Sequence, residues 1–374
     1  MGYKILGINL SHNGSVCVLD DGEIVFFLEE DRLSKVKHDP HPINLLKTIS
    51  TKFNIDQISI SGIDGFISNL FYFKSIKFLF QEYFPQIPVY NYFRYHHHCH
   101  SSISFFNSGF DKALSVIIDG SGNCDIRHKS ITSASKENET LQIAKYPFKP
   151  QNVYKGYSTF NPFKIGKKRH GYSLVGISNT YEAITRYLGF QWNEAGKTMG
   201  LSSYGKPDKN IPSLYKKYRG NPSLIKLVRG LKGEVNPKSF PYLKLKTNPK
   251  EWHKNPSKIT NLEKNIAYKT QQESQQVVGD LIEKGLKETG LKQVCCSGGY
   301  FLNCVTNYYL TKRFPDIKFY FEPIASDAGT AIGAAKLAWH EKTYDKKLRP
   351  QKTLYYGPEY TKEQLLEGIQ KYLD

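Results

Sequence analysis

The sequence contains no apolar run that approaches the roughly 18 consecutive residues of a membrane-spanning helix, so no membrane partner is expected. Cysteine is also scarce, with six in 374 residues and none in C-x-x-C spacing. An even number of cysteines is compatible with disulfides. Because Met1-Gly2 leads into a strand without a signal peptide, we expect free buried thiols and a cytoplasmic location, in the host cytoplasm if the source is viral.

Acidic residues are the second shortage. The chain has 34 Asp and Glu against 52 Lys and Arg, which gives a net charge of +18. The segment from Gln151 to Thr260 holds 21 Lys and Arg but 5 Asp and Glu, an excess of 16 positive charges. Such a one-sided field indicates a polyanionic partner, whereas a solubilising lysine surface is the plainer alternative. Because the excess is concentrated in one segment, we favour the functional interpretation.

Two strand-and-turn units in the chain are alike. Residues 3–9, 15–20 and 23–28 read as strands separated by short turns, which predicts an antiparallel meander. A second buried strand, 113–119, ends in a glycine turn at 120–122, much as the first strand runs into Asn-Gly before its neighbour. This internal repeat predicts a duplicated, two-lobed α/β fold whose lobes each begin with a strand and a phosphate-facing turn.

The same pattern sets the expected domain boundaries. We expect a first lobe over 1–112, a second lobe over 113–340, and a C-terminal linker with one helix over 341–374. The second lobe is expected to include a basic insertion at about 131–260, where prolines interrupt the pattern. Apolar spacing predicts a long helix over 263–288.

Aromatic residues are interleaved with lysines in the insertion. Rings among cations can stack on bases while the lysines contact phosphates; alternatively, the rings pack the insertion onto the body of the protein. The rings concerned are Tyr146, Phe148, Tyr154, Tyr157, Phe160 and Phe163.

Two histidines and two aspartates form a candidate metal site. His96 and His100 are four residues apart, so on a helix they share one face. Asp119 and Asp327 each follow a strand beside a glycine turn, where open twisted sheets place ligand groups. Two imidazoles and two carboxylates suit a borderline divalent ion, with iron the leading choice and manganese or zinc the alternatives.

Glycine turns are candidates for phosphate contacts, because their backbone N–H groups approach a phosphate without side-chain obstruction. Gly120 with Gly122, and Gly298 with Gly299, stand in such turns. Asn303 opens the helix that follows, where it can contact a ribose or a phosphate.

Six stretches, taken together, resemble the NodU/CmcH-type O-carbamoyltransferases from residue 1 to about residue 360. The most specific is Glu194–Gly205, which is similar to E-x-G-K-x-M-G-L-x-x-Y-G, and His96–His100 is similar to H-H-x-x-H. The others are residues 6–15, 29–39, 297–303 and 327–335.

The resemblance implies the two-lobed actin/hexokinase-like fold, a duplicated ribonuclease H-like architecture shared with the tRNA threonylcarbamoyl transferases. It implies metal ligands at His96, His100, Asp119 and Asp327. It implies ATP or ADP contacts at Gly120, Lys197, Gly298, Gly299 and Asn303, and places His12, Lys37 and His38 on the carbamoyl or acceptor side.

The implied reaction moves a carbamoyl group from carbamoyl phosphate, through a carbamoyl-adenylate, to a hydroxyl. His12 is a candidate for the group that takes the acceptor's proton, with a structural role in its turn as the alternative. Members of the family continue into a second domain that makes the carbamoyl-adenylate. Since this sequence has no such domain, we expect a separate carbamoyl-adenylate-forming subunit, a truncated chain, or a chain that acts differently.

The basic segment suggests the acceptor. We expect the hydroxymethyl group of a modified pyrimidine in DNA, presented as a flipped or single-stranded base. A small sugar-type acceptor is the first alternative and a tRNA threonylcarbamoyl transferase-like reaction the second. The third is a non-catalytic subunit that binds nucleotide and nucleic acid.

Overall fold

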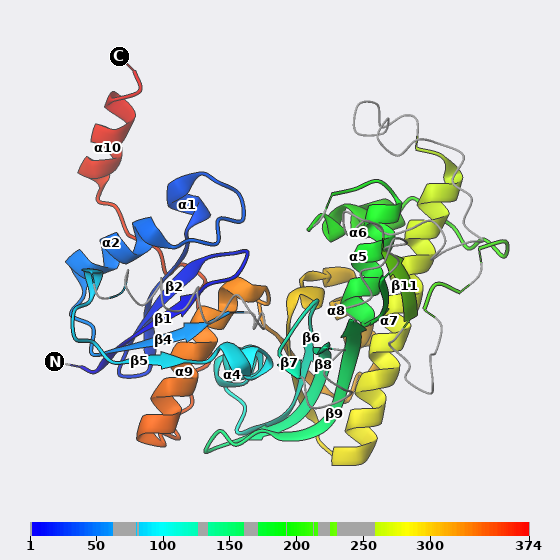
Figure 1. The fold of residues 1–374 in the computed structure, drawn as a ribbon, viewed down its shortest axis with the longest axis horizontal. Coiled ribbons are helices and arrows are strands. Elements are labelled where there is room, and N and C mark those ends of the chain that lie inside the picture. The colour runs from blue at the N-terminus through cyan, green and yellow to red at the C-terminus, as the bar shows by residue number, and fades with distance from the viewer. Residues whose placement is uncertain are drawn as a thin grey trace.

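The first lobe is built on the meander that the sequence predicts (Figure 1). This computed structural model describes residues 2–62, 80, 82–125, 134–160, 171–191, 193–211, 213–215, 225–229 and 259–373. The strands of the first lobe are β1 (Lys4–Asn9), β2 (Ser15–Asp20), β3 (Glu23–Glu29), β4 (Gln57–Ser61) and β5 (Val89–Asn91). Their order is β3-β2-β1-β4-β5: β2 is antiparallel to β1 and β3, while β4 is parallel to β1 and β5.

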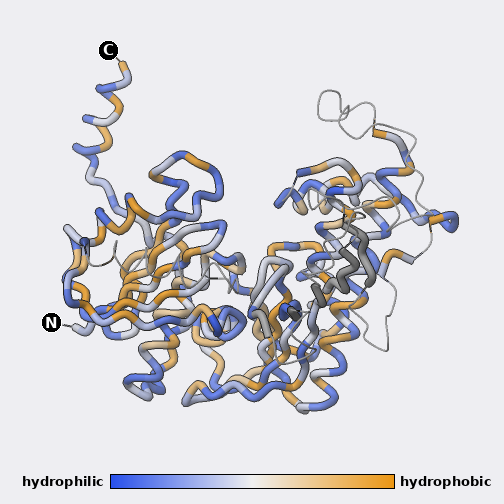
Figure 2. The backbone as a smooth tube through the Cα atoms, viewed as in Figure 1, coloured by the Kyte–Doolittle hydropathy of each residue, from blue (hydrophilic) through white to orange (hydrophobic). Residues whose placement is uncertain are grey.

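Side chains of β1 alternate between two buried layers. Leu6 and Ile8 join an apolar cluster with Leu45 and Ile49 of α2 (Ile43–Lys52), whereas Ile5 faces the opposite layer. A short helix, α1 (Asp31–Ser34), follows β3. Figure 2 shows apolar residues concentrated along the strands of this sheet. Burial on both faces explains why β1 reads as a nearly continuous apolar run.

The second lobe repeats the strand order of the first. Its strands are β6 (Lys112–Ile118), β7 (Cys124–Asp125), β8 (Ala134–Lys145), β9 (Gln151–Phe160), β10 (Gly171–Val175), β11 (Ile225–Arg229), β12 (Gln293–Ser297) and β13 (Lys318–Phe321). The path β9-β8-β6-β12-β13 has the same order and directions as β3-β2-β1-β4-β5, and β10 and β11 extend it. The predicted duplicated, two-lobed actin/hexokinase-like fold is therefore confirmed.

Two central helices exchange lobes. The first, α4 (His96–Ser108), follows β5 of the first lobe but packs on β6, β8 and β12. The second, α9 (Thr330–Thr343), follows β13 of the second lobe but packs on β1, β2 and β4. Glycines allow the close approach: a Cβ on Gly7 would lie 2.0 Å from the Ala331 carbonyl oxygen, and one on Gly333 would lie 2.1 Å from that of Cys99.

Of the remaining helices, α5 (Ile177–Tyr187) and α7 (Asn261–Thr289) pack on the second sheet, while α6 (Ala195–Ser202) and α8 (Cys304–Arg313) pack on α7. The last helix, α10 (Lys362–Gln370), lies in the C-terminal segment. The long helix predicted over 263–288 is confirmed as α7, which Thr260 and Glu263 cap reciprocally and which ends at Gly290 with φ 66°. Among the described residues, no helix has the length and apolar character needed to cross a membrane.

The structure differs from the sequence expectation between residues 134 and 160. This stretch was expected to open the basic insertion, but it forms β8 and β9, a hairpin in the sheet. Tyr146 and Phe148 pack on Phe105, with ring centroids 5.3 and 5.8 Å apart, so for these two rings the packing alternative is correct. Phe163 and most of the lysines between 206 and 258 lie outside the described residues.

Candidate metal centre and active site

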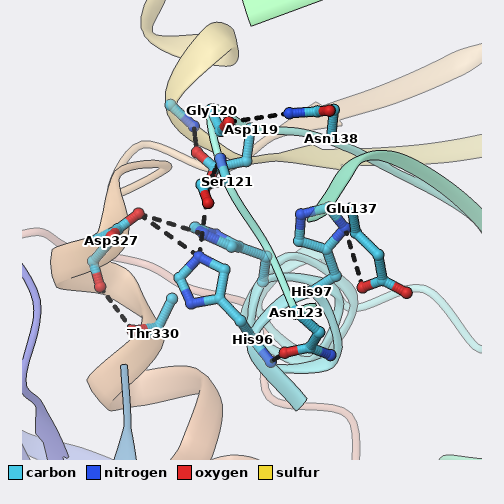
Figure 3. Close-up of polar contacts among 12 residues, drawn as sticks. His96, His97, Asp119, Gly120, Ser121, Asn123, Glu137, Asn138, Asp327 and Thr330 are labelled. Atoms are coloured by element: carbon cyan, nitrogen blue, oxygen red, sulfur yellow. Dashed lines mark hydrogen bonds and ion pairs between the residues drawn. The ribbon is translucent and has the colours of Figure 1, made fainter. Parts of the chain in front are cut away.

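Four side chains that the sequence singled out meet where the two central helices begin. His96 and His100 lie in the first two turns of α4, Asp119 directly follows β6, and Asp327 lies in the short turn before α9. One ligand atom from each of the four lies within 4.8 Å of the others, and all four side chains are buried. Figure 3 shows Asp119 and Asp327 pointing toward His96 from two different segments. We call these four residues the metal cluster.

The ligand atoms of the metal cluster face one another but form no hydrogen bonds with one another. His96 Nε2 lies 3.5 Å from Asp119 Oδ2 and 3.7 Å from Asp327 Oδ1, and His100 Nε2 lies 3.7 Å from the same Asp327 oxygen. Within the described part of the chain, both Nε2 atoms and Asp327 Oδ2 are buried without a hydrogen-bond partner. Buried polar atoms are normally satisfied, so their convergence here fits a divalent cation held by two nitrogens and two carboxylates.

The far side of each ligand is held in place. His96 Nδ1 contacts the Gly62 carbonyl oxygen at 3.2 Å, and His100 Nδ1 contacts Ser297 Oγ at 3.1 Å. The Asp119 carboxylate accepts from the N–H groups of Gly299 at 3.1 Å and Ser121 at 3.2 Å. Such outer contacts set the ring tautomer and aim the ligands. No sequence signal marks the Gly62 contact, because a backbone carbonyl has no side-chain signature, whereas Ser297 stands in the glycine-turn motif.

The charges within the metal cluster are mutually dependent. Burial opposes a charge on His96, but the carboxylates of Asp327 and Asp119 raise its pKa. Burial also opposes a charge on Asp119, but His96 and His100 hold the pKa of that carboxyl well below its usual range. The two histidines therefore favour the ionised form of Asp119, the form that can act as a metal ligand.

Of the three residues expected on the carbamoyl or acceptor side, His12 lies against the metal cluster. Its Nε2 is 3.5 Å from Asp327 Oδ2, and its side chain is 31% exposed. His38 lies edge-on to His12 with ring centroids 6.4 Å apart, and burial followed by the charge of Lys37 lowers its pKa. Lys37 itself is exposed on the loop. His12 thus combines contact with the cluster and access from solvent.

The glycine turns frame Asp119. A Cβ on Gly120 would have one neighbour within 4 Å, Asn179 Oδ1 at 3.6 Å, while the Gly120 carbonyl accepts from the side-chain NH₂ groups of Asn138 and Asn179. By contrast, the Gly122 N–H donates to the Glu137 carbonyl, the Gly298 N–H to the Ala325 carbonyl, and the Gly299 N–H to Asp119. Three of the four expected phosphate donors are therefore engaged inside the protein in this structure.

Asn303 and Lys197 lie further out. Asn303 caps α8 by accepting from the Thr306 N–H at 3.0 Å, and its amide donates to Gln271 Oε1 at 2.8 Å. Lys197, on α6, pairs with Glu194 and lies 6.0 Å from the centre of the Phe190 ring. The nucleotide contacts of both residues stay predictions.

The neighbouring histidine of the run turns away from the metal cluster. His97 is 1% exposed, and its Nδ1 contacts Thr140 Oγ1 at 2.7 Å and lies 3.8 Å from Glu137 Oε2 (Figure 3). This agrees with the expectation from helical spacing that His97 points elsewhere. Helical spacing thus places the imidazoles of His96 and His100 in the metal cluster and directs that of His97 toward Thr140 and Glu137.

Several known proteins are similar to this chain. The chain is 28% identical over 286 residues to an uncharacterized protein of Synechocystis sp., covering 73% of this chain and 41% of that protein. It is 22% identical over 400 residues to the nodulation protein NolNO of Sinorhizobium fredii, covering 95% and 50%. It is 23% identical over 287 residues to the nodulation protein NolO of Bradyrhizobium diazoefficiens, covering 73% and 43%. The chain thus spans half or less of the length of these relatives.

Solved structures show the same architecture. Full-length HypF in its phosphate- and nucleotide-bound form matches with a TM-score of 0.56 at 13% identity, covering 91% of this chain and 47% of that one. HypF of T. kodakarensis matches with a TM-score of 0.51 at 10% identity, covering 92% and 48%. The model of the carbamoyltransferase N-terminus matches residues 83–336, which include all four residues of the metal cluster. The chain therefore belongs to the carbamoyltransferase family.

Proposed function

We propose that this chain catalyses transfer of a carbamoyl group to a hydroxyl at the metal cluster. The observation that carries the proposal is the convergence of two imidazoles and two carboxylates, drawn from both lobes, in a chain of the carbamoyltransferase family. A divalent metal bound there would supply Lewis-acid stabilisation of the oxygen charge that develops during acyl transfer.

The donor in this proposal is a carbamoyl-adenylate made from carbamoyl phosphate and ATP. The acceptor hydroxyl oxygen forms a bond to the carbamoyl carbon, the bond from that carbon to the phosphate oxygen breaks, and AMP leaves. His12, which lies beside Asp327 and is partly exposed, takes the hydroxyl proton at Nε2. The products are the O-carbamoyl ester and AMP.

Nucleotide binding belongs to the same proposal. HypF, whose structure is phosphate- and nucleotide-bound, shares the two-lobed fold. In this chain the turn at Gly120 adjoins Asp119, so a phosphate held at that turn would lie beside the metal cluster. Lys197, Gly122, Gly298, Gly299 and Asn303 are the further candidates.

The acceptor is a separate question. A hydroxymethyl pyrimidine in DNA was expected from the excess of 16 positive charges in residues 151–260, and most of those lysines lie outside the described residues. Phe148 is buried and Tyr146 is partly buried, and both rings pack on Phe105, which removes part of the support for base stacking. The experiment that tests the proposal therefore includes both a DNA acceptor and a sugar acceptor.

The test is mass spectrometry of acceptors incubated with the full chain and iron(II) or zinc(II). One set receives carbamoyl phosphate and ATP; a second receives carbamoyl-adenylate prepared in advance, which bypasses activation by another domain or subunit. Acceptors are DNA containing hydroxymethylcytosine or hydroxymethyluracil, and an aminoglycoside. A gain of one carbamoyl group that is lost in Asp327→Asn supports the proposal. No gain with the prepared adenylate, in protein shown to bind the metal, contradicts it.

A further inference from the structure

Two adjacent glutamates at the end of β3 have different roles. Glu30 is fully buried, and its carboxylate accepts from the backbone N–H groups of Asn44 at 3.2 Å and Leu45 at 3.0 Å. It thereby caps the first turn of α2. Glu29 points the other way, toward the turn between β1 and β2, and the function described above makes no use of it.

A chain of contacts leads from Glu29 to the metal cluster. The Asn13 side-chain NH₂ donates to Glu29 Oε2 at 3.0 Å, and Asn13 Oδ1 lies 2.5 Å from His12 Nδ1. On the opposite side of the ring, His12 Nε2 faces Asp327 Oδ2 at 3.5 Å. The three residues Glu29, Asn13 and His12 thus form a continuous relay, which we call the Glu29–Asn13–His12 relay.

The chemistry of the three groups fixes the direction of this relay. An ionised carboxylate only accepts hydrogen bonds, so Glu29 requires the NH₂ group of Asn13. The Asn13 carbonyl oxygen must then face His12 Nδ1, and a carbonyl there requires a proton on that nitrogen. A flipped amide would set two acceptors 3.0 Å apart at Glu29, which disfavours the reverse arrangement.

The turn that carries the relay is anchored on all sides. Asn9 donates its side-chain NH₂ to the Asn13 carbonyl at 2.8 Å. The Gly14 N–H donates to the Asp39 carbonyl, and the Glu30 N–H donates to the Gly14 carbonyl, both at 2.8 Å. A Cβ on Gly14 would lie 2.8 Å from that same Asp39 oxygen, so the turn fits closely against its neighbour. The backbone of the relay is therefore held independently of its side chains.

We propose that Glu29 and Asn13 are positioning residues that fix the His12 ring and keep its proton at Nδ1, so that proton exchange takes place at Nε2 beside the metal cluster. This inference rests on the proposed function for its purpose, but its geometry does not depend on that function. Neither residue touches the metal cluster directly. Their effect is to decide which nitrogen of His12 faces the reacting groups.

The test is the tautomer of His12 in the zinc-loaded full chain, read from long-range ¹H–¹⁵N correlations of ¹⁵N-histidine protein and assigned with His12→Gln. We expect the Nδ1–H form in the wild type. Glu29→Ala should shift His12 toward the Nε2–H form that a free neutral imidazole favours. Glu29→Gln should restore the wild-type pattern, because the glutamine oxygen can still accept from Asn13. Glu359→Ala, at an exposed glutamate of the C-terminal linker, is the matched control.

Two further measurements separate positioning from folding and from the proposed reaction. Zinc(II) affinity should stay unchanged in Glu29→Ala, while carbamoyl transfer should fall about tenfold in kcat and recover in Glu29→Gln. Asn13→Ser provides the same test if Glu29→Ala does not fold. An Nε2–H form in the wild type, or an unchanged tautomer in both variants, overturns the relay. Absence of carbamoyl transfer in the wild type contradicts the proposed function and leaves the tautomer result standing.

Discussion

The two ends of the α4–α9 helix pair each bury a histidine, in opposite electrostatic environments. At the end where both helices begin, carboxylates of Asp327 and Asp119 outweigh the cost of burial and raise the pKa of His96. At the far end, His340 stacks on Phe106 with ring centroids 3.7 Å apart, and burial lowers its pKa to about 4. Burial alone therefore does not make a site; the facing carboxylates do.

The two duplicated lobes make different contributions to the helix pair and to the metal cluster. Each lobe donates one helix to the pair, and both helices start at the carboxyl ends of the strands of the two sheets. The first-lobe helix brings imidazoles to that end, and the second lobe brings carboxylates from Asp119 and Asp327. The repeated fold supplies matching positions, and the difference in side chains supplies a ligand set that suits a divalent cation.

The largest expected effect is the loss of metal binding at the end where α4 and α9 begin. Asp327→Asn or His100→Ala removes a ligand, so zinc(II) affinity should fall about 100-fold or more, beyond the cost of an outer contact. Ser297→Ala, which removes the contact to His100 Nδ1, should cost about tenfold. Competition with a chelating dye measures all three. Equal affinities in Asp327→Asn and the wild type would remove that residue from the ligand set.

Metal should also stabilise the fold, because only the folded chain brings the four ligands together. Zinc(II) at 100 times its Kd is expected to raise the free energy of unfolding by about 2.7 kcal/mol. Denaturant titrations with zinc(II) and with a chelator measure the difference. The gain should vanish in Asp327→Asn, and a gain that persists there would place the stabilising ion elsewhere.

The next prediction concerns the close packing of α4 against α9 between their two ends. Gly333→Ala would set a Cβ 2.1 Å from the Cys99 carbonyl oxygen, so α4 and α9 must separate, at a cost of about 2 kcal/mol in unfolding free energy. Gly200→Ala is the matched control, since nothing lies within 4 Å of its Cβ position and alanine favours a helix by up to about 1 kcal/mol. Chemical denaturation of both variants reads the result. Equal stability of Gly333→Ala and the wild type would contradict close contact of the helices.

The sequence indicated the parts of the molecule whose signals are local. Helical spacing of His96 and His100, and strand ends beside glycine turns at Asp119 and Asp327, were enough to name the metal cluster that the structure assembles. Strand β8 was mistaken for an insertion because its buried positions include a run of polar residues, Glu137, Asn138, Glu139 and Thr140, which sequence patterns assign to a loop. Contacts that join distant segments, such as His96 Nδ1 to the Gly62 carbonyl, leave no local trace at all.

The smallest expected effect belongs to the far end, where His340 must stay neutral. Its pKa is about 4 in the folded chain and near 6.5 when unfolded, so the unfolded state binds more protons between these values. The contribution of His340 to the unfolding free energy is therefore fully present above pH 6.5 and declines as the pH falls toward 4, with a loss of about 1 kcal/mol between pH 7 and 5.5.

His340→Phe keeps an aromatic ring against Phe106 and removes the titration. Unfolding free energies at the two pH values, measured with a chelator so that the metal cluster stays empty in both proteins, should show a smaller decline in the variant. An identical decline would mean that the far end tolerates a charge, and that the contrast between the two buried histidines is weaker than their surroundings indicate.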